Sequence, residues 1–426
     1  MNNKNKIRLP LIMMAVMLAI SGIESKAQDW PQWRGANRDG VAKATNINLD
    51  WSAKKPPLAW TFRQAGSGYS APVVVGTTLY CQGAADGSDF AFALDTQTGA
   101  LKWKQNLGAY YTCSDNRGDG PRGSVTVDGD KLYLIRGGGQ IHCLSAADGK
   151  MLWQKDFAKD FNGKLMSRWG HSESPLVDGN IVICTPGGEG GYIVALDKNS
   201  GALVWRTKEL TGDAAHSSAI IVDIDGIRQY VQQTNKGVTG ISAKDGKMLW
   251  KVDIPQYKIA VIPTPVTNNN FVYVTNGYNG GSTCIRLTKE GNGVKADTVY
   301  TSSPALSNPH GGVVLVNGYI YGVTDRQGFV CQDFKTGESV WRERSQGVVN
   351  GVTVAVNDRL ILLNETDGLI VVVAASPAGW KEFGRMEFPE RTKLQNRNNQ
   401  VWTHPIVANS KLYLRDHDLL FCFDLK

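Results

Sequence analysis

The feature that most constrains the fold is a short sequence unit that recurs along the chain and ends in tryptophan. In its clearest form, Ala147–Trp153, a polar residue and a glycine precede two apolar residues and the Trp. The copies end at Trp103, Trp153, Trp205, Trp250 and Trp341. Asp-Gly and similar pairs tolerate the positive φ of a tight turn, so each unit is typical of a hairpin turn that leads into a β-strand. The first four tryptophans are 45 to 52 residues apart, a period that predicts the blades of a β-propeller.

The blades can be counted from the sequence. The chain has 426 residues, 47 of them glycine, and shows no long helical periodicity, which favours a turn-rich all-β protein. Seven complete blades follow residue 58, with Tyr300 in the Trp position of the fifth, and the last repeat, Pro405–Lys426, has only three strands. The segment Pro57–Phe62 carries a Trp without preceding strands. We predict that it supplies the missing strand and closes an eight-bladed propeller of four-stranded antiparallel blades.

The N-terminus has the pattern of a secretory signal. Basic residues between Lys4 and Arg8 precede an apolar run, Leu9–Ile20, and small residues that end at Ala27. We expect cleavage near Ala27, which defines residues 1–27 as a signal peptide. No Cys lies there, so we expect a periplasmic or secreted protein without a lipid anchor. The apolar run is too short for a membrane span. The sequence lacks a basic patch with interleaved aromatic residues, so we expect no binding to nucleic acid. We also expect a monomer.

Residues 28–57 separate this signal from the propeller, which we assign to residues 58–426. The segment contains Asp29–Gly40, where two Trp, two Arg and two Gly occur within twelve residues. We predict a strap that packs its Trp rings onto the propeller and anchors the N-terminus. The alternative is that Arg34 and Arg38 face a binding surface.

The repeats resemble those of the PQQ-repeat β-propellers, which are also called PQQ-like or BamB-like. The resemblance rests on a small-apolar-Leu-Asp pattern followed by Thr-Gly or Ser-Gly, as in Ala93–Gly99 and Ala195–Gly201, and it covers residues 58–426. The opening Trp30–Gly35 is similar to the start of many exported bacterial members. The resemblance implies the fold and two contrasting uses, which are quinone-dependent dehydrogenation of alcohols or sugars and the non-catalytic role of BamB-type lipoproteins in outer-membrane protein assembly.

The chain departs from both of these uses. It lacks the pair of adjacent cysteines that caps the quinone in the dehydrogenases, and it lacks the Cys-x-x-Cys-His haem motif. We therefore predict no cofactor and regard PQQ as disfavoured. The BamB-type lipoproteins carry an anchoring Cys after the signal, which is also absent here. Sharing their fold does not establish either function.

The seven cysteines are predicted to be packing residues. Four of them occupy the strand position that holds Ala93 and Ala195 in sister repeats: Cys143, Cys284, Cys331 and Cys422. Equivalent positions on neighbouring sheets are ~10 Å apart, beyond the ~7 Å reach of a disulfide between Cα atoms. We expect buried thiols without a disulfide framework, with Cys113 as the plausible reactive thiol.

Histidines gather where the chain enters the first strand of several repeats. In a propeller this strand lines the central channel, and the loop before it surrounds one mouth. We predict that the loops form a polar funnel, and the candidate residues are Tyr69, Arg122, Arg168, Trp169, His171, Glu173, His216, His310, Asn350, Gln400, Trp402 and His404. Two further histidines lie elsewhere, and we interpret His142 as structural and His417 as a solvated residue of a hairpin turn.

The residue types of the funnel favour binding. Arg and Trp suit an anionic or sugar-like ligand through charge and ring stacking. Imidazoles and a carboxylate could also act as acid and base, whereas the chain has no local His spacing typical of a metal site and we predict no metal. Our leading hypothesis is an exported cell-envelope propeller that binds a small polar or sugar-like ligand, or an envelope protein partner, without catalysis. The alternative is a carbohydrate-directed lyase or oxidoreductase, and a PQQ-dependent dehydrogenase ranks behind both.

Overall fold

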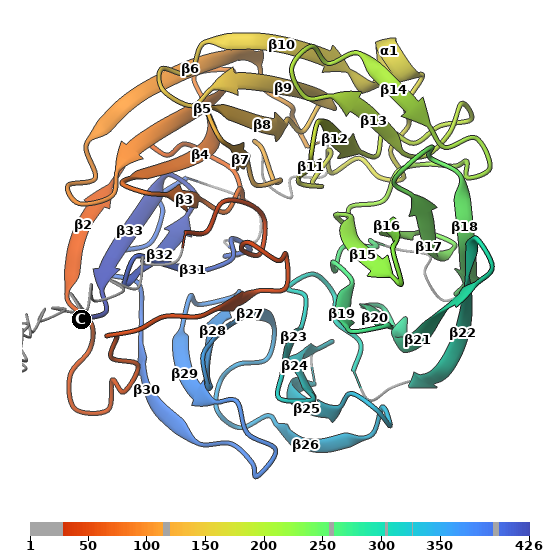
Figure 1. Cartoon of the computed structure of the whole chain (residues 1–426). Coiled ribbons are helices and arrows are strands. Elements are labelled where there is room, and N and C mark those ends of the chain that lie inside the picture. The colour runs from red at the N-terminus through yellow and green to blue at the C-terminus, as the bar shows by residue number, and fades with distance from the viewer. Residues whose placement is uncertain (1–28, 114–119, 255–259, 303–305, 326, 395–399) are drawn as a thin grey trace, which may run out of the picture.

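The fold is a ring of eight β-sheets arranged around a common centre (Figure 1). The computed structural model describes residues 29–113, 120–254, 260–302, 306–325, 327–394 and 400–426. The predicted signal peptide, residues 1–27, lies outside the described residues. Each blade has four antiparallel strands, and the first strand lies nearest the centre of the ring, as predicted.

The strands follow one another in chain order through the first seven blades. Blades one and two contain β3 (Val73–Val75), β4 (Thr78–Ala85), β5 (Ser88–Asp95), β6 (Leu101–Ala109), β7 (Thr126–Asp128), β8 (Lys131–Ile135), β9 (Gln140–Ser145) and β10 (Met151–Asp156). Blades three and four contain β11 (Leu176–Asp178), β12 (Ile181–Cys184), β13 (Val194–Asp197), β14 (Leu203–Arg206), β15 (Ile220–Ile224), β16 (Ile227–Thr234), β17 (Gly237–Ser242) and β18 (Met248–Asp253).

The second half of the ring repeats the arrangement. Blades five and six contain β19 (Val266–Asn268), β20 (Phe271–Asn276), β21 (Gly281–Glu290), β22 (Gly293–Ser302), β23 (Val314–Val316), β24 (Tyr319–Thr324), β25 (Gly328–Asp333) and β26 (Ser339–Glu343). Blades seven and eight contain β27 (Gly351–Val356), β28 (Arg359–Asn364), β29 (Ile370–Ala374), β30 (Glu382–Met386), β31 (Ile406–Ala408), β32 (Lys411–Asp416), β33 (Leu419–Asp424) and β2 (Leu58–Phe62). The short helix α1 (Phe157–Phe161) follows β10. Among the described residues, no helix is long and apolar enough to cross a membrane.

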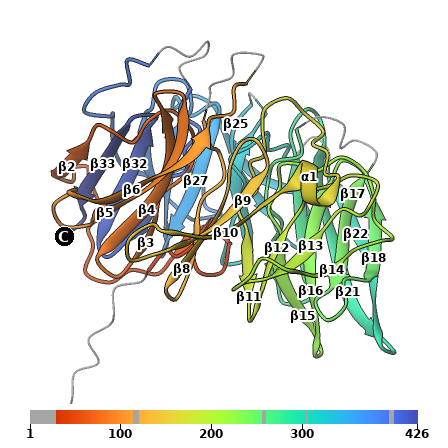
Figure 2. The same cartoon turned by 90° about the horizontal axis from the view of Figure 1, so that it is seen from above.

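The two ends of the propeller share blade eight, so the prediction of ring closure is confirmed. Strand β2 pairs antiparallel with β33, and Trp60 lies opposite Cys422. The buried guanidinium of Arg415 on β32 donates to the carbonyls of Ser70 and Gln82, which belong to blade one. In the view of Figure 2, β2 lies beside β33 and β32, with which it forms one sheet.

The recurring Trp joins several blades to the next one, whereas Trp250 donates its indole N–H to Gln229 of its own blade. Trp103 on β6 donates its indole N–H to the carbonyl of Ala146 in blade two, at 3.1 Å. The turn glycine of that next blade, Gly149, lies against the same ring, where an added Cβ would come within 2.6 Å of it. Its φ of 74° also favours glycine. In blade five Tyr300 makes the equivalent bond through its hydroxyl, to the carbonyl of Phe334 at 2.8 Å. At these boundaries the turn Gly of one blade therefore meets the aromatic residue of the blade before it.

The cysteines are part of this packing. All seven lie in the described residues, all are buried, and none forms a disulfide. Cys143 lies between Tyr133 and Trp153 in the strand pairing of its sheet, and Cys331 lies between Tyr321 and Trp341. Cys113 has only 2% of its surface exposed, which does not agree with the predicted role as the reactive thiol. Its side chain is turned inward instead of being presented to solvent.

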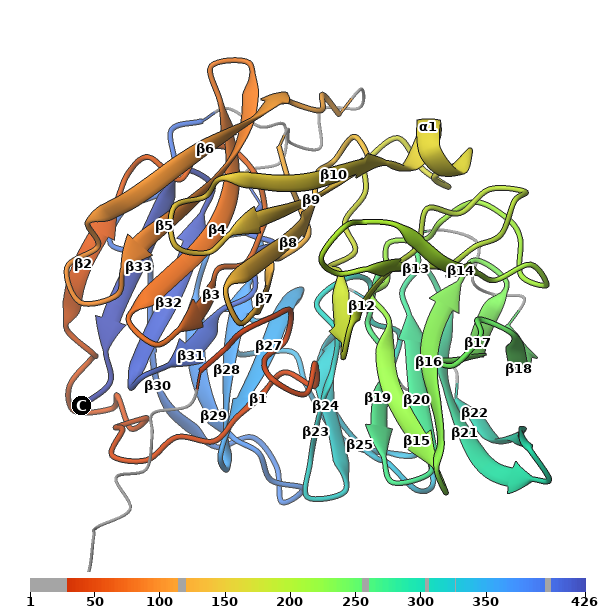
Figure 3. The ribbon, with the colours of Figure 1, turned by 45° about the horizontal axis from the view of Figure 1, so that its top comes forward.

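The N-terminal strap runs across the centre of the ring (Figure 3). It begins beside blade one, where Trp30 and Val74 exchange two backbone hydrogen bonds. It reaches blade seven as β1 (Val41–Ala42), which pairs in parallel with β27. Both arginines of the strap, Arg34 and Arg38, are 2% exposed and donate to backbone carbonyls of the propeller. They anchor the strap and do not face a solvent-exposed binding surface.

Candidate functional site

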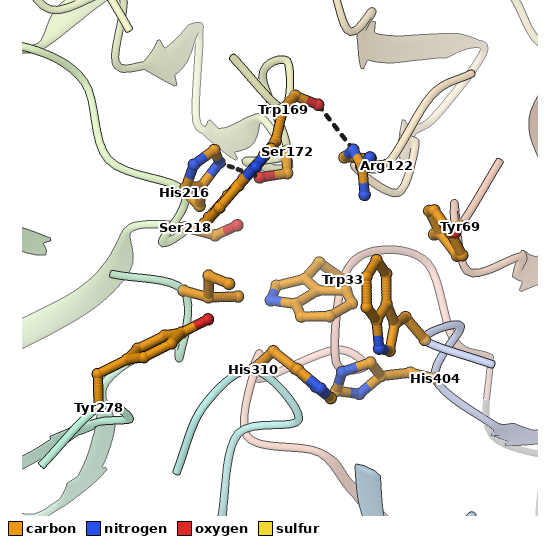
Figure 4. Close-up of a pocket in the computed structure, with 12 residues that line it drawn as sticks. Trp33, Tyr69, Arg122, Trp169, Ser172, His216, Ser218, Tyr278, His310 and His404 are labelled. Carbon is orange, nitrogen blue, oxygen red and sulfur yellow. Dashed lines mark hydrogen bonds between the residues drawn. The ribbon is translucent and has the colours of Figure 1, made fainter. Parts of the chain in front are cut away.

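A cavity of about 130 Å³ lies at one mouth of the channel (Figure 4). Its walls come from the loops before the first strands of seven blades, together with Tyr278 of blade five and one strap residue. The lining residues are Trp33, Tyr69, Arg122, Trp169, Ser172, His216, Ser218, Ile262, Tyr278, His310, Trp402 and His404. Side chains that are up to 371 positions apart in the sequence therefore face one another because the ring closes.

Seven of the twelve predicted funnel residues line this cavity. They are Tyr69, Arg122, Trp169, His216, His310, Trp402 and His404. The other five do not line it, and they are Arg168, His171, Glu173, Asn350 and Gln400. The loop before β11 explains part of this difference, because Trp169 and Ser172 point inward while Arg168 is exposed and His171 and Glu173 are buried behind the wall.

Aromatic rings form two opposite walls. On one side the rings of Tyr69 and Trp402 lie 4.9 Å apart between centroids, and Arg122 lies over the Tyr69 ring at 4.9 Å. On the other side Trp169 stacks on His216 with centroids 5.6 Å apart and an interplanar angle of 26°. Arg122 links the two walls, since its Nε donates to the carbonyl of Trp169 at 2.8 Å. The arrangement leaves ring faces and one guanidinium around a central space.

Trp33 of the strap forms the floor of the cavity. Its indole N–H donates to the hydroxyl of Thr264 at 2.8 Å, and its ring meets His404 edge-on at 4.5 Å. In Figure 4 the Trp33 ring lies in the middle of the lining residues. Burial and the nearby guanidinium of Arg34 hold the pKa of His404 well below its ordinary value, so this imidazole is neutral. The sequence placed Trp33 in the strap but gave no signal that it reaches the funnel.

His216 is held by hydroxyl groups on both of its ring nitrogens. Nδ1 hydrogen-bonds with Ser172 Oγ at 2.7 Å, and Nε2 hydrogen-bonds with Ser167 Oγ at 2.8 Å. Burial, with smaller contributions from Arg122 and His171, lowers the pKa of His216 to about 3. The imidazole is therefore uncharged at neutral pH. It is poorly suited to act as a general base, because an effective general base needs a pKa near the working pH.

His310 faces the cavity from blade six and is oriented by a carboxylate of blade seven. Its Nε2 donates to Oε2 of Glu365 at 2.5 Å, and Trp402 Nε1 donates to the same oxygen at 2.8 Å. Burial acts to raise the pKa of Glu365, but bonds from His310, Trp402 and Asn350 outweigh it and keep that pKa below its ordinary value. Glu365 thus stays ionised behind the wall. Sequence reasoning missed it because it follows a second strand instead of preceding a first one.

His171 and Glu173 lie behind the wall. The His171 ring meets Phe157 of α1 at 5.2 Å, and burial lowers its pKa to about 4. The Glu173 carboxylate accepts from the backbone N–H and the hydroxyl of Thr185. Burial is the larger influence on Glu173 and raises its pKa to about 7, against the lowering effect of Thr185 and Arg38. These two groups support the loop before β11 and do not reach the cavity.

The prediction that His417 is solvated is wrong. Only 2% of its surface is exposed, and its ring meets that of Tyr69 at 4.7 Å. Its Nδ1 accepts from the backbone N–H of Gly68 at 3.4 Å. Burial lowers its pKa to about 4. The turn between β32 and β33 faces the neighbouring blade instead of the solvent, so the residue packs behind the cavity wall.

The cavity is poorly matched to a metal or to PQQ. Within the described residues, no three His, Cys, Asp or Glu side chains lie together as a metal site. PQQ carries three carboxylates, whereas Arg122 is the sole Lys or Arg among the described residues that line the cavity. Arg34 lies beneath the floor, where its Nη2 donates to the carbonyls of Asp39 and Val313.

Comparison with known proteins identifies the family. A family model for the outer membrane protein assembly factor BamB matches residues 91–343. This chain belongs to that family. It is 24% identical over 343 residues to BamB of Moranella endobia (strain PCIT), which covers 74% of this chain and 79% of the relative. The resemblance to PQQ-repeat, BamB-like propellers is thereby confirmed.

Dehydrogenases share the repeat over a smaller part of their length. The chain is 29% identical over 206 residues to the lanthanide-dependent methanol dehydrogenase of Methylacidiphilum fumariolicum (strain SolV), which covers 45% of this chain and 30% of the enzyme. This match spans less than a third of that enzyme.

Solved structures agree on the fold. BamB from Moraxella catarrhalis superposes with a TM-score of 0.61 at 16% identity, covering 87% of this chain and 98% of that one. The quinohemoprotein alcohol dehydrogenase from Comamonas testosteroni gives a TM-score of 0.63 at 13% identity, covering 93% and 80%. At such identities the likeness shows the common propeller and nothing about chemistry.

Proposed function

We propose that this chain is an exported cell-envelope protein that binds a small, sugar-like polar ligand in the cavity without catalysis. The observation that carries the proposal is the pair of facing aromatic walls, Trp169 on one side and Trp402 with Tyr69 on the other, above the indole floor of Trp33. Ring faces and a few fixed polar groups are the usual composition of a small-molecule site.

The protonation states support binding over acid–base chemistry. His216 and His404 are held neutral by burial, and both ring nitrogens of His216 are occupied by serine hydroxyls. The His216 imidazole can hydrogen-bond a hydroxyl group of a ligand if that hydroxyl replaces Ser167 or Ser172 as its partner. Arg122 adds a charge that suits a weakly anionic substituent.

Membership of the BamB family supports a place in the cell envelope. The relatives are named as outer membrane protein assembly factors, and the N-terminal sequence has the pattern of a secretory signal. A protein partner fits the same proposal if it is an envelope protein that inserts a polar side chain or a chain end into the cavity.

A ligand screen by thermal unfolding tests the proposal. The probes are glucose, galactose, mannose and N-acetylglucosamine, each also as its 6-phosphate. A ligand at 100 times its Kd stabilises the folded state by about 2.7 kcal/mol and raises the unfolding temperature measurably. Trp402→Ala removes about 50 Å² of ring face, so at about 25 cal/mol per Å² we expect about ten-fold weaker binding. Trp380→Ala, on the outer side of blade seven, is the matched control and should bind as the wild type does. Failure of every probe to stabilise the wild type would contradict the proposal.

One observation favours the enzymatic alternative. The carboxylate of Glu365 orients the His310 imidazole toward the cavity, which is the arrangement of a general acid–base pair. A carbohydrate-directed lyase or oxidoreductase would use this pair. Turnover that stops abruptly in His310→Ala would establish it, whereas a binding protein would show a graded loss of affinity.

We further propose that the chain acts without PQQ. The support is the single guanidinium of Arg122 among the described lining residues, set against the three carboxylates of the quinone. Equilibrium dialysis against free PQQ, read by visible absorbance, tests this point. Retention of one equivalent per chain would contradict it.

A further inference from the structure

The strap closes the channel beneath the cavity. Between Asp29 and Ala42 it contacts seven of the eight blades, through backbone or side-chain groups of their inner strands or of the loops before them. The propeller residues that make these contacts are Val74, Val127, Ser174, Pro175, Thr264, Val313, Ala355 and His404. This part of the strap is fixed because it is held at so many points around the ring. We call it, Asp29 to Ala42, the plug.

The arginines of the plug make it costly to displace. Arg38 donates to the carbonyls of Ser174 at 2.8 Å and Pro175 at 3.0 Å in blade three, and Arg34 donates to the carbonyl of Val313 in blade six. Both guanidinium groups are buried. Withdrawing the strap would leave these carbonyls without donors in the interior, which is unfavourable. The cavity is therefore open at its mouth and closed at Trp33.

We infer that the cavity binds the terminal unit of a polar chain end-on, and that Trp33 sets the depth to which this unit enters. The inference rests on the proposed function. A channel open at both ends could hold an internal unit of a polymer with the chain continuing on either side. A cavity closed by an anchored indole requires the ligand to end at the floor.

The size of the cavity agrees with a single unit. Its volume of about 130 Å³ is well below the ~300–1,000 Å³ of pockets that enclose drug-sized molecules. Thr264 and His404 fix the Trp33 ring from two sides, so the floor is rigid. The remaining units of the ligand would leave the cavity through its mouth, past Arg122 and the half-exposed Tyr278.

An array of immobilised glycans tests the inference, with each sugar presented once as the exposed terminus and once capped by a further unit. Labelled wild-type protein should bind glycans that share a terminal unit, and capping that unit should lower the signal at least ten-fold. Binding to glycans that share an internal unit, whatever their terminus, would overturn end-on recognition and leave the proposed function intact. Absence of binding to every glycan would overturn both.

Variants at the floor test the role of Trp33. Trp33→Ala should weaken binding of the terminal unit at least ten-fold, and Thr264→Val, which removes the acceptor of the indole N–H, should weaken it less. Trp51→Ala is the matched control, because Trp51 is a buried strap residue that packs on blade seven. If Trp33→Ala fails to fold, Thr264→Val still decides the matter. Wild-type affinity in every floor variant that folds would refute the role assigned to Trp33.

Discussion

The neutral state of His216 yields a prediction whose size can be worked out from the structure. Burial lowers the pKa of His216 to about 3 from an ordinary 6.5. The unfolded chain takes up a proton below about pH 6.5, whereas the folded protein does not until about pH 3. Folding stability is therefore present above the unfolded pKa and is lost as the pH falls through this window.

The expected magnitude follows from the width of the window. Between pH 6.5 and 4.5 the unfolded state is favoured by about 1.4 kcal/mol per pH unit, so His216 alone should cost about 3 kcal/mol of folding free energy at pH 4.5. The assay is urea unfolding of the wild type and of His216→Gln at pH 7.5 and 4.5. The loss between the two pH values should be about 3 kcal/mol smaller in the variant.

The cause of the shift can be tested separately. Burial is the leading cause of the low pKa, so Ser172→Ala, which removes one hydrogen bond to the ring, should leave most of the shift in place. The imidazole carbon resonances of His216, followed by NMR in the folded protein, report this pKa directly. A titration midpoint near 6.5 in the folded state would refute the reasoning.

The remaining predictions concern the wall, the closure and the repeat. The wild type should lose stability as the pH rises from about 4.5 to 7, because the raised pKa of Glu173 makes the folded protein keep a proton that the unfolded chain releases, and Glu173→Gln should remove this loss. Urea unfolding at pH 5 and 8 measures the free energy of unfolding of both proteins. An equal change in that free energy between the two pH values in both proteins would count against the prediction. Deletion of residues 58–62 should unfold the whole propeller by circular dichroism, because β33 then loses its partner, and loss of one blade's worth of signal would contradict it. Gly149→Ala should cost about 1–3 kcal/mol in thermal unfolding, since its Cβ would meet the Trp103 ring at a positive φ; Gly129→Ala, which has φ 59° but open space around it, is the control and should cost less.

The repeat made the architecture predictable. The Gly of a unit is required by the local turn, and the Gly and Trp together are required by the contact between neighbouring blades. Trp103 and Gly149 are separate signals in the sequence and one contact in the structure. The same regularity placed the loops before the first strands around one mouth. It could not say which side chain of a loop turns inward, as Trp169 and His171 illustrate, because that depends on packing against α1 and the neighbouring blade.

Three of the residues that sequence reasoning missed lie away from the loops before the first strands, whereas Ser172, Ser218 and Ile262 lie within those loops. Glu365 follows a second strand and acts on the cavity through His310 and Trp402. Trp33 belongs to a segment that no blade contains, and Tyr278 projects from the turn between the second and third strands of blade five. A pattern that is defined by periodicity gives no position for such residues. Their roles depend on contacts across the ring.

The strap links the stability of the molecule to its cavity. Its buried arginines stabilise the inner strands of blades three and six, and the same segment holds Trp33 in the floor. A mutation that loosens the plug would therefore lower stability and deepen the cavity together, whereas a mutation on the walls, such as Trp402→Ala, would change binding with little effect on the ring. This coupling explains how a segment that belongs to no blade can give the cavity a closed, rigid floor.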